Sequence, residues 1–107
     1  MLDDKPVGMA VFIINEKIKT RHIANIYCVF VKEKFRGKGI GKKLINSTLN
    51  IIGQNKSVSK IKLAVNSEQN TAVDLYKQFG FNVVGRLKKE LRIDNKFYDE
   101  LIMEKLI

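Results

Sequence analysis

A glycine-rich loop lies between an apolar run at residues 23–31 and an amphipathic run at residues 41–52. The loop consists of Arg36, Gly37, Lys38, Gly39, Ile40 and Gly41. Alternate glycines let successive backbone N–H groups turn toward one point without Cβ clashes, and the helix that follows adds the positive end of its dipole. This order of strand, glycine loop and helix predicts an anion site, for which a pyrophosphate is the natural ligand.

Two common phosphate loops are excluded by the same residues. The dinucleotide pattern G-x-G-x-x-G fails, because the further glycine that it requires after Gly39 and Gly41 is absent. The P-loop pattern requires Ser or Thr after Gly-Lys to hold magnesium, but Lys43 follows Gly41 and Lys42. P-loops also carry a glycine five residues before the second one, and that position is Arg36.

From Arg36 the loop reads Arg-x-x-Gly-x-Gly, which resembles the acetyl-CoA pyrophosphate loop of the GNAT superfamily of acyl-CoA-dependent N-acyltransferases. Residues 69–81 are similar to the family's Asn-x-x-Ala-x-x-Leu-Tyr-x-x-x-Gly-Phe segment. Residues 97–104 are similar to the last strand of many bacterial members. The resemblance covers the chain from about Pro6 onward, and it implies an N-acetyltransferase with acetyl-CoA as co-substrate.

Composition bounds the size and the partners of the protein. A chain of 107 residues with 45% apolar content is expected to form a single domain over residues 1–107. The net charge of +9 favours anionic partners, and coenzyme A, nucleic acid or simply a solvated basic surface would account for it. We expect no nucleic-acid partner, because the sheet aromatics are sparse and the glycine loop would have no role there.

The single cysteine, Cys28, lies in an apolar strand pattern and is interpreted as a small core residue rather than a nucleophile. Because it has no second cysteine to pair with, it indicates a reducing compartment. The first residues are acidic where a secretory signal is basic, and no apolar run approaches membrane-spanning length. The sequence therefore predicts a cytoplasmic protein without a membrane partner.

Apolar periodicity predicts a mixed α/β domain with the order β-β-α-β-α-β-β. The expected elements are strands at 7–14 and 23–31, a helix at 41–52, a strand at 60–65, a helix from a cap at Ser67 to about Phe79, and strands at 82–93 and 97–106. The first two strands are apolar on both faces, as in central strands covered on both sides, and they should pair antiparallel. The third should run parallel to the second, and the last two should form a hairpin through residues 94–96. Gly53 and Gly80 should end the two helices.

This order lacks the strand and helices with which GNAT domains normally begin, and which form much of the acceptor-substrate wall in the family. The chain is then either a fragment or a short form whose open sheet edge is covered by a partner. The simplest partner is a second copy related by a two-fold axis, so we expect a homodimer.

The resemblance implies which residues bind acetyl-CoA. The loop from Arg36 to Gly41 would hold the pyrophosphate, with further charge from Lys42 and Lys43. Where the family's two parallel strands splay, backbone amides would face the pantetheine and the thioester carbonyl, and the residues there are Val29, Phe30 and Val31. Gln69 or Asn70 would contact the pantetheine or phosphate region. Gln69 stands where the family prefers Asn, so helix-end polarity is an equal interpretation of this pair.

Tyr76 occupies the position of the family's general acid. A thiol with a pKa of about 8.5 leaves as a thiolate only if a nearby group protonates it, and a phenol with a pKa of about 10 remains protonated at neutral pH. The alternative is a core aromatic, because Tyr76 shares an apolar face with Phe79.

No base for the acceptor ammonium stands out. Asn25 is found where many relatives carry a strand glutamate. Glu90, Asp99 and Glu100 are candidates, directly or through water, and surface salt bridges are the alternative for all of them. His22 is interpreted as a solvated turn residue, and no metal-ligand cluster is present in the sequence.

The resulting hypothesis is an N-acetyltransferase in which an amine attacks the thioester directly, without a covalent enzyme intermediate. The acceptor would be a small-molecule amine or a protein amine. The alternative is a non-catalytic CoA-binding or regulatory module, which the absent amino-terminal elements and the absent glutamate favour. Release of CoA with a panel of amines separates the two hypotheses.

Overall fold

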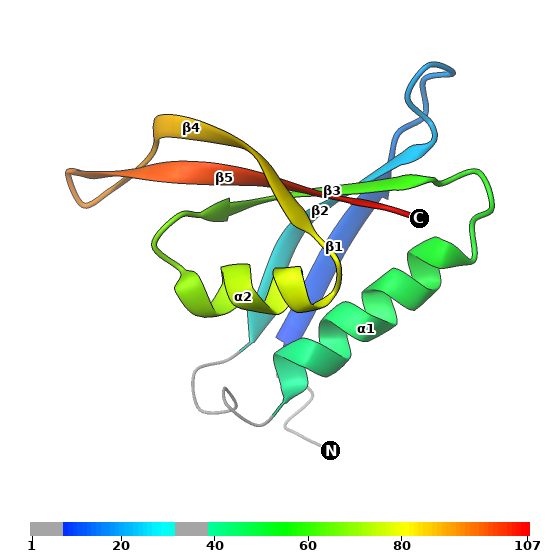
Figure 1. Ribbon diagram of the computed structural model, residues 1–107, viewed down its shortest axis with the longest axis horizontal. Helices are drawn as coiled ribbons and strands as arrows, with labels where there is room; N and C mark the ends of the chain where they lie inside the picture. Colours follow the sequence, from blue (N-terminus) through cyan, green and yellow to red (C-terminus); the bar gives the residue numbers. More distant parts are fainter. Residues whose placement is uncertain (1–7, 32–38) are drawn as a thin grey trace.

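The computed structural model describes residues 8–31 and 39–107, which form one five-stranded mixed sheet in the order β1-β2-β3-β5-β4 and two helices (Figure 1). The elements in chain order are β1 (Gly8–Ile14), β2 (Ile23–Val31), α1 (Ile40–Gly53), β3 (Lys60–Asn66), α2 (Asn70–Gln78), β4 (Asn82–Ile93) and β5 (Lys96–Leu106). The expected element order and the mixed α/β class are confirmed. In the described ranges, neither helix is long and apolar enough to cross a membrane.

The strands pair in the expected directions. β1 and β2 are antiparallel, β2 and β3 are parallel, and β4 and β5 form an antiparallel hairpin. The hairpin turn consists of Asp94 and Asn95, whose φ angles of 51° and 66° are those of a two-residue type I′ turn. The turn is one residue shorter than expected, because Lys96 already pairs with Ile93.

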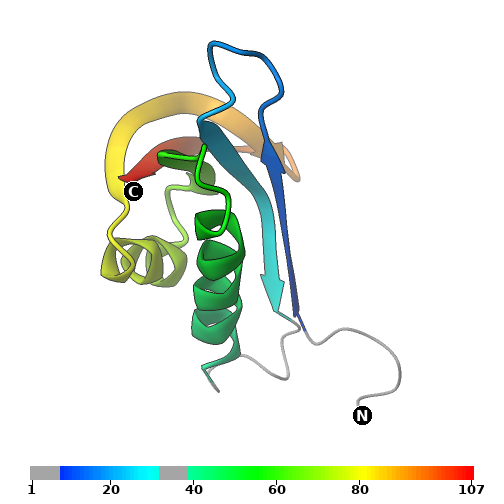
Figure 2. The same ribbon diagram turned by 90° about the vertical axis from the view of Figure 1, so that its right-hand side faces the viewer.

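The core lies between the sheet and the two helices, which cover the same face of the sheet (Figure 2). In β3, Ile61, Leu63 and Val65 are buried and alternate with less buried residues. The buried residues of the helices follow helical spacing, and they are Ile45, Thr48 and Ile52 in α1 and Val73 and Tyr76 in α2. Each helix therefore lays one stripe on the sheet, as its periodicity predicts.

Neither helix covers the opposite face of the sheet, which we call the open face. On it, Ile13 of β1 and Tyr27 of β2 are 54% and 65% exposed, and β1 lies at the sheet edge. The expectation that both strands are central is therefore wrong for β1, whereas β2 does lie between two strands, and the expectation that they are covered on both sides is wrong for the open face. Apolar residues on both faces of a strand show that both faces favour burial, but they do not show what covers each face. Here both helices pack on one face of the sheet and leave the other uncovered.

The start of α2 differs from the expectation that Ser67 is its cap. The N-cap residue is Gln69. The side-chain oxygen of Asn66 accepts a hydrogen bond from the N–H of Glu68 (3.0 Å), a turn that carries the chain from β3 into the helix. The Ser67 N–H donates to the Asp99 carbonyl of β5 (2.9 Å), so Ser67 lies in the turn after β3 and is bonded to the sheet rather than to the helix.

Only one of the two glycines ends its helix as expected. Gly80 follows the C-cap residue Phe79 with a φ of 91°, the left-handed conformation in which glycine terminates helices. The Lys105 ammonium donates to the Phe79 carbonyl (2.5 Å) and so satisfies an acceptor at the helix end. In α1, Gly53 instead belongs to the last turn, and Gln54 is the C-cap residue.

Candidate active site at the split between β2 and β3

The parallel ladder between β2 and β3 is short, and the strands separate beyond it. It joins Ile23 to Lys60 at one end and Ile26 to Leu63 at the other. From there β2 continues paired with β1, and β3 continues paired with β5. Over the described residues, the facing edges of β2 and β3 beyond Ile26 and Leu63 do not pair with each other (Figure 1). Ligands commonly bind at such openings, at the carboxyl ends of parallel strands.

A bulge in β2 accounts for the split. Val11 of β1 pairs with Cys28 and Phe12 pairs with Ile26, which leaves Tyr27 as an extra residue. A bulge bends its strand and increases the local twist. Tyr27 directly follows the last β2 residue that pairs with β3, so the bend falls where the strands part. Nothing in the apolar pattern of β2 predicts the bulge, and only its register with β1 reveals it.

The separated part of β2 contains the strand residues that the resemblance implies for acetyl-CoA, namely Val29, Phe30 and Val31. Their side chains lie outside what the structure describes. Their backbone lies beyond the last β2–β3 pair, where N–H and C=O groups directed toward β3 are open to a ligand. Their contact with acetyl-CoA stays a prediction.

The start of α1 is uncapped. Gly39, its N-cap residue, has a φ of 75° and makes no side-chain cap, and a Cβ there would meet nothing within 4 Å. The first helical bond runs from the Lys43 N–H to the Gly39 carbonyl (3.1 Å), so the N–H groups of Ile40, Gly41 and Lys42 precede the helical ladder. Together with the exposed Lys42 and Lys43 side chains, these groups favour an anion. The rest of the loop lies outside the described residues: Arg36, Gly37 and Lys38.

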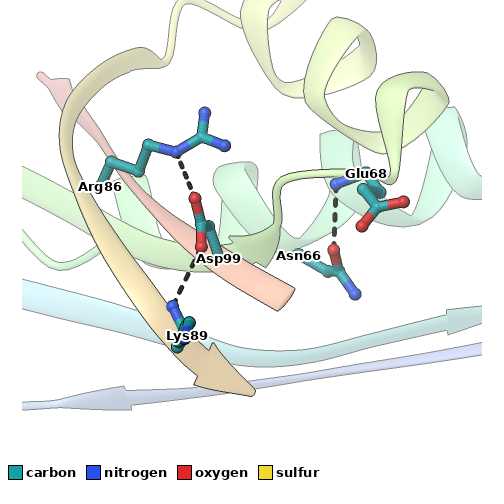
Figure 3. Close-up of polar contacts among 5 residues, drawn as sticks. All are labelled: Asn66, Glu68, Arg86, Lys89 and Asp99. Atoms are coloured by element: carbon teal, nitrogen blue, oxygen red, sulfur yellow. Dashed lines mark hydrogen bonds and ion pairs between the residues drawn. The ribbon is translucent and has the colours of Figure 1, made fainter. Parts of the chain in front are cut away.

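The start of α2 follows directly on the end of β3, through the turn that the Asn66 side chain makes with the Glu68 N–H (Figure 3). Gln69, the N-cap residue, makes no side-chain cap, and both Gln69 and Asn70 are exposed. Their position at an open helix start suits the predicted contact with acetyl-CoA, and that contact remains a prediction.

Tyr76 projects from α2 into the core. Its side chain is 7% exposed, and its ring meets the Phe81 ring edge to face, with the two centroids 6.0 Å apart. Burial of this kind fits the core-aromatic interpretation. It equally suits a proton donor, because proton transfer to a thiolate is most useful where water is scarce. The role of proton donor therefore stays a prediction.

A pocket of about 460 Å³ lies where β2, β3 and β5 meet. Its lining residues come from these three strands: Asn25, Ile26, Tyr27, Lys62, Leu63, Ala64, Glu100 and Ile102. Most of them alternate with the buried residues that face the helices, so the pocket opens on the open face. Ile26 and Leu63 are the last pair of the parallel ladder, so the pocket also reaches the apex of the split.

The structure separates the three candidate bases. Asp99 accepts hydrogen bonds from the Lys89 backbone N–H (3.0 Å) and from Arg86 Nε (2.7 Å) (Figure 3). The Lys89 hydrogen bond first, and the Arg86 guanidinium after it, hold the pKa of the Asp99 carboxyl below its usual 3.8, so Asp99 is a weak proton acceptor. Glu90 is exposed on β4 and is not among the residues of the pocket, whereas Glu100 lines it.

Asn25 and His22 lie on β2 and just before it. The Asn25 amide lines the pocket and donates a hydrogen bond to the side-chain oxygen of Asn15 (3.0 Å). Since a neutral amide does not take up a proton near neutral pH, Asn25 does not replace the family glutamate as a base. The His22 side chain is exposed, as expected for a solvated turn residue. No group of His, Cys, Asp or Glu side chains in residues 8–31 and 39–107 could hold a metal ion.

Comparison with known families assigns the chain to a class of acyl-transferring enzymes. The model of the acetyltransferase (GNAT) family matches residues 1–81. The chain therefore belongs to the GNAT acetyltransferase family, and the resemblance seen in its motifs is confirmed.

Curated relatives include an uncharacterized N-acetyltransferase of Methanocaldococcus jannaschii, which is 33% identical over 94 residues, covering 86% of this chain and 41% of that protein. A spermine/spermidine N(1)-acetyltransferase of Bacillus subtilis is 31% identical over 54% of this chain and 38% of its own length. N-alpha-acetyltransferase 50 of Danio rerio is 36% identical over 47% of this chain and 30% of its own length. The chain thus spans less than half the length of these relatives.

Solved structures that share the fold include the following two. A GNAT-family acetyltransferase of Streptococcus pneumoniae matches 100% of this chain and 64% of its own chain with a TM-score of 0.92 at 24% identity. NAA60 of Arabidopsis thaliana in complex with acetyl-CoA matches 79% of this chain and 48% of its own chain with a TM-score of 0.73 at 28% identity.

Proposed function

We propose that this protein transfers the acetyl group of acetyl-CoA to a primary amine. The observation that carries the proposal is the split between β2 and β3, which has the uncapped start of α1 near one end and a pocket at its apex. In acetyl-CoA, the pyrophosphate is suited to the positive start of a helix, and the amide groups of the pantetheine are suited to an unpaired strand edge. Membership of the GNAT family and the acetyl-CoA complex of the related NAA60 support the same activity.

The residues present fit acetyl-CoA. The pyrophosphate would accept hydrogen bonds from the first N–H groups of α1, where the absence of a side chain at Gly39 leaves room for it. Arg36, Gly37 and Lys38 would extend this cradle. The pantetheine would pair with the backbone of Val29 to Val31, and Gln69 or Asn70 would bind it from the start of α2.

The chemistry is direct acyl transfer. The amine nitrogen attacks the thioester carbonyl carbon, a C–N bond forms, and the C–S bond breaks. Backbone N–H groups of the separated part of β2 would stabilise the oxyanion that develops on the carbonyl oxygen. Tyr76 would give its hydroxyl proton to the departing thiolate, and no covalent enzyme intermediate forms.

The acceptor is proposed to be a small-molecule amine or a protein amine. The names of the relatives support both classes, since one acts on spermine and spermidine and another is an N-alpha-acetyltransferase.

The activity is tested by measuring CoA released from acetyl-CoA with spermidine, lysine and a peptide that begins with alanine, against a control without amine. Release that depends on an amine supports the proposal. Calorimetric binding of acetyl-CoA without release for any amine would instead identify the non-catalytic CoA-binding module and reject the enzyme.

We further propose that the protein acts as a homodimer in the cytoplasm. The exposed apolar residues of the open face support a second copy as partner, because such surface is seldom left in water. The presence of a single cysteine supports a reducing compartment.

A further inference from the structure

Glu100 is the one carboxylate among the residues that line the pocket at the split. It is half-buried, and within residues 8–31 and 39–107 no side chain forms a hydrogen bond or ion pair with it. Its neighbours differ in this respect. Glu104 pairs with Lys60 (2.8 Å), and Asp99 is held by Arg86 and Lys89. A pocket-lining carboxylate that is not already ion-paired can accept a strong, charge-assisted hydrogen bond from a bound cation.

The place of Glu100 in the sheet matches where an acceptor must lie. Glu100 pairs with Asn66, the last residue of β3, three residues beyond Leu63, where the parallel ladder ends. Three residues of strand span about 10 Å, a distance that a glutamate side chain and an amine hydrogen-bonded to it can cover. An amine held by Glu100 on the open face would therefore face the opening between the strands.

The remaining lining of the pocket indicates what the amine is attached to. Tyr27, Ala64 and Ile102 provide apolar surface, which suits an aliphatic stem. Lys62 of β3 also lines the pocket, and its positive charge would repel a second ammonium group. The lining thus fits a single ammonium on an aliphatic stem better than it fits a polyamine.

We propose that Glu100 binds the ammonium group of the acceptor and takes its proton, and that the acceptor is a primary monoamine on an aliphatic stem, such as a lysine side chain. This inference rests on the acetyltransferase activity proposed above. The ammonium gives one proton to the Glu100 carboxylate, and the free amine attacks the thioester. The second nitrogen proton passes to water as the C–S bond breaks, Tyr76 gives its hydroxyl proton to the thiolate and regains one from water, and Glu100 finally releases its own proton to water, so that one proton is released for each amide formed.

The test compares Glu100→Gln with Glu104→Gln in the full chain, with n-butylamine and spermidine as probes. Glu104 is the matched control, because it lies on the same strand and face but outside the pocket lining. Near neutral pH, Glu100→Gln should lower kcat/KM for n-butylamine by roughly 100-fold or more, the scale of a lost general base. The loss should shrink toward about pH 10, where alkylamines become neutral. Glu104→Gln should stay within about two-fold of the parent, and acetyl-CoA affinity should not change in either variant.

The possible results distinguish a failure of the role of Glu100 from a failure of the acetyltransferase activity itself. If the parent releases CoA with an amine and Glu100→Gln behaves like Glu104→Gln, Glu100 has no such role and the acetyltransferase stands. Faster turnover of spermidine than of n-butylamine would overturn the monoamine assignment. A parent that binds acetyl-CoA but acetylates no amine overturns the proposed function and the role of Glu100 with it. Glu100→Asp, which keeps a carboxylate, should recover part of the activity; failure to exceed Glu100→Gln would also count against the proposal.

Discussion

At Tyr76, the packing role of the ring can be separated from the proposed proton-donor role of the hydroxyl by substitution with phenylalanine. Phenylalanine keeps the ring that packs against Phe81 but has no proton to give. We expect Tyr76→Phe to bind acetyl-CoA as the parent does and to lower kcat by roughly ten- to a thousand-fold. Tyr98→Phe on β5, which removes a hydroxyl elsewhere, is the control. Equal turnover in the two variants would make Tyr76 a core aromatic.

Lys42 tests the anion site at the start of α1. Its side chain is exposed in the first turn, beside N–H groups that precede the helical ladder. Lys42→Glu reverses a charge at the positive end of the helix, and we expect the affinity for acetyl-CoA to fall by roughly ten-fold at low salt. Lys56→Glu makes the same charge change in the exposed segment after α1. Calorimetry that finds equal losses in both would indicate a diffuse charge effect and contradict the site.

At the scale of elements, Asp99 secures a bulge in β4. Leu87 pairs with Glu100 and Leu91 with Tyr98, so the three β4 residues between them face Asp99 alone. Lys89, in that bulge, has a φ of 54°, which is unfavourable for a side chain with a Cβ. The hydrogen bonds that Asp99 accepts there compensate for this conformation and lower its pKa.

The lowered pKa of Asp99 predicts a pH dependence of stability. Folding favours the charged carboxyl, so its contribution is present above the usual pKa of 3.8 and is lost as the pH falls through the lower folded value. Thermal melting should therefore show a smaller acid-induced loss for Asp99→Asn than for the parent. Asp94→Asn, in the turn of the same hairpin, is the control, and identical pH curves for the parent and Asp99→Asn would contradict the linkage.

The two glycines near the helix ends should respond oppositely to alanine. Gly80 has a φ of 91°, and a Cβ there would lie 2.8 Å from the Lys105 Nζ that binds the end of α2. We expect Gly80→Ala to lower the free energy of unfolding by about 1–2 kcal/mol. At Gly53 a Cβ meets nothing within 4 Å, and Gly53→Ala should raise stability by about 0.5 kcal/mol through helix propensity. Urea unfolding measures both, and a loss at Gly53 as large as that at Gly80 would contradict the assignment of these helix ends.

At the scale of the whole molecule, we expect the open face to determine the state of assembly. If a second copy covers it, a charge at Ile13, which is 54% exposed on that face, should prevent association. We expect the parent to sediment as a dimer at micromolar concentration and Ile13→Glu as a monomer. Ile18→Glu is the control, since Ile18 is 82% exposed in the link between β1 and β2. A parent that sediments as a monomer with cooperative melting would reject the homodimer.

Properties that depend on a few neighbouring residues could be predicted from the sequence alone. The order of elements, a helix start next to the glycine loop, the end of α2 at Gly80 and the β4–β5 hairpin all follow from local patterns of apolar residues, glycines and turn residues. These patterns act within one or two turns of chain, so they leave a clear trace in the sequence. The family motifs around Gly39 and Tyr76 are equally local, which is why they identified the family.

Properties that depend on contacts between distant segments were decided by the tertiary structure. The edge position of β1, the bulge at Tyr27 and the resulting split exist only through the register of paired strands. The same is true of the carboxylates: Asp99 and Glu100 are neighbours in sequence, yet one is bound by Arg86 and Lys89 and the other lines the pocket. A strand directs successive side chains to opposite faces, and what each side chain meets depends on residues far away in the chain. For this reason, the sequence alone determined the family and the secondary-structure elements of this protein. Only the tertiary structure distinguished the surroundings of Asp99 from those of Glu100.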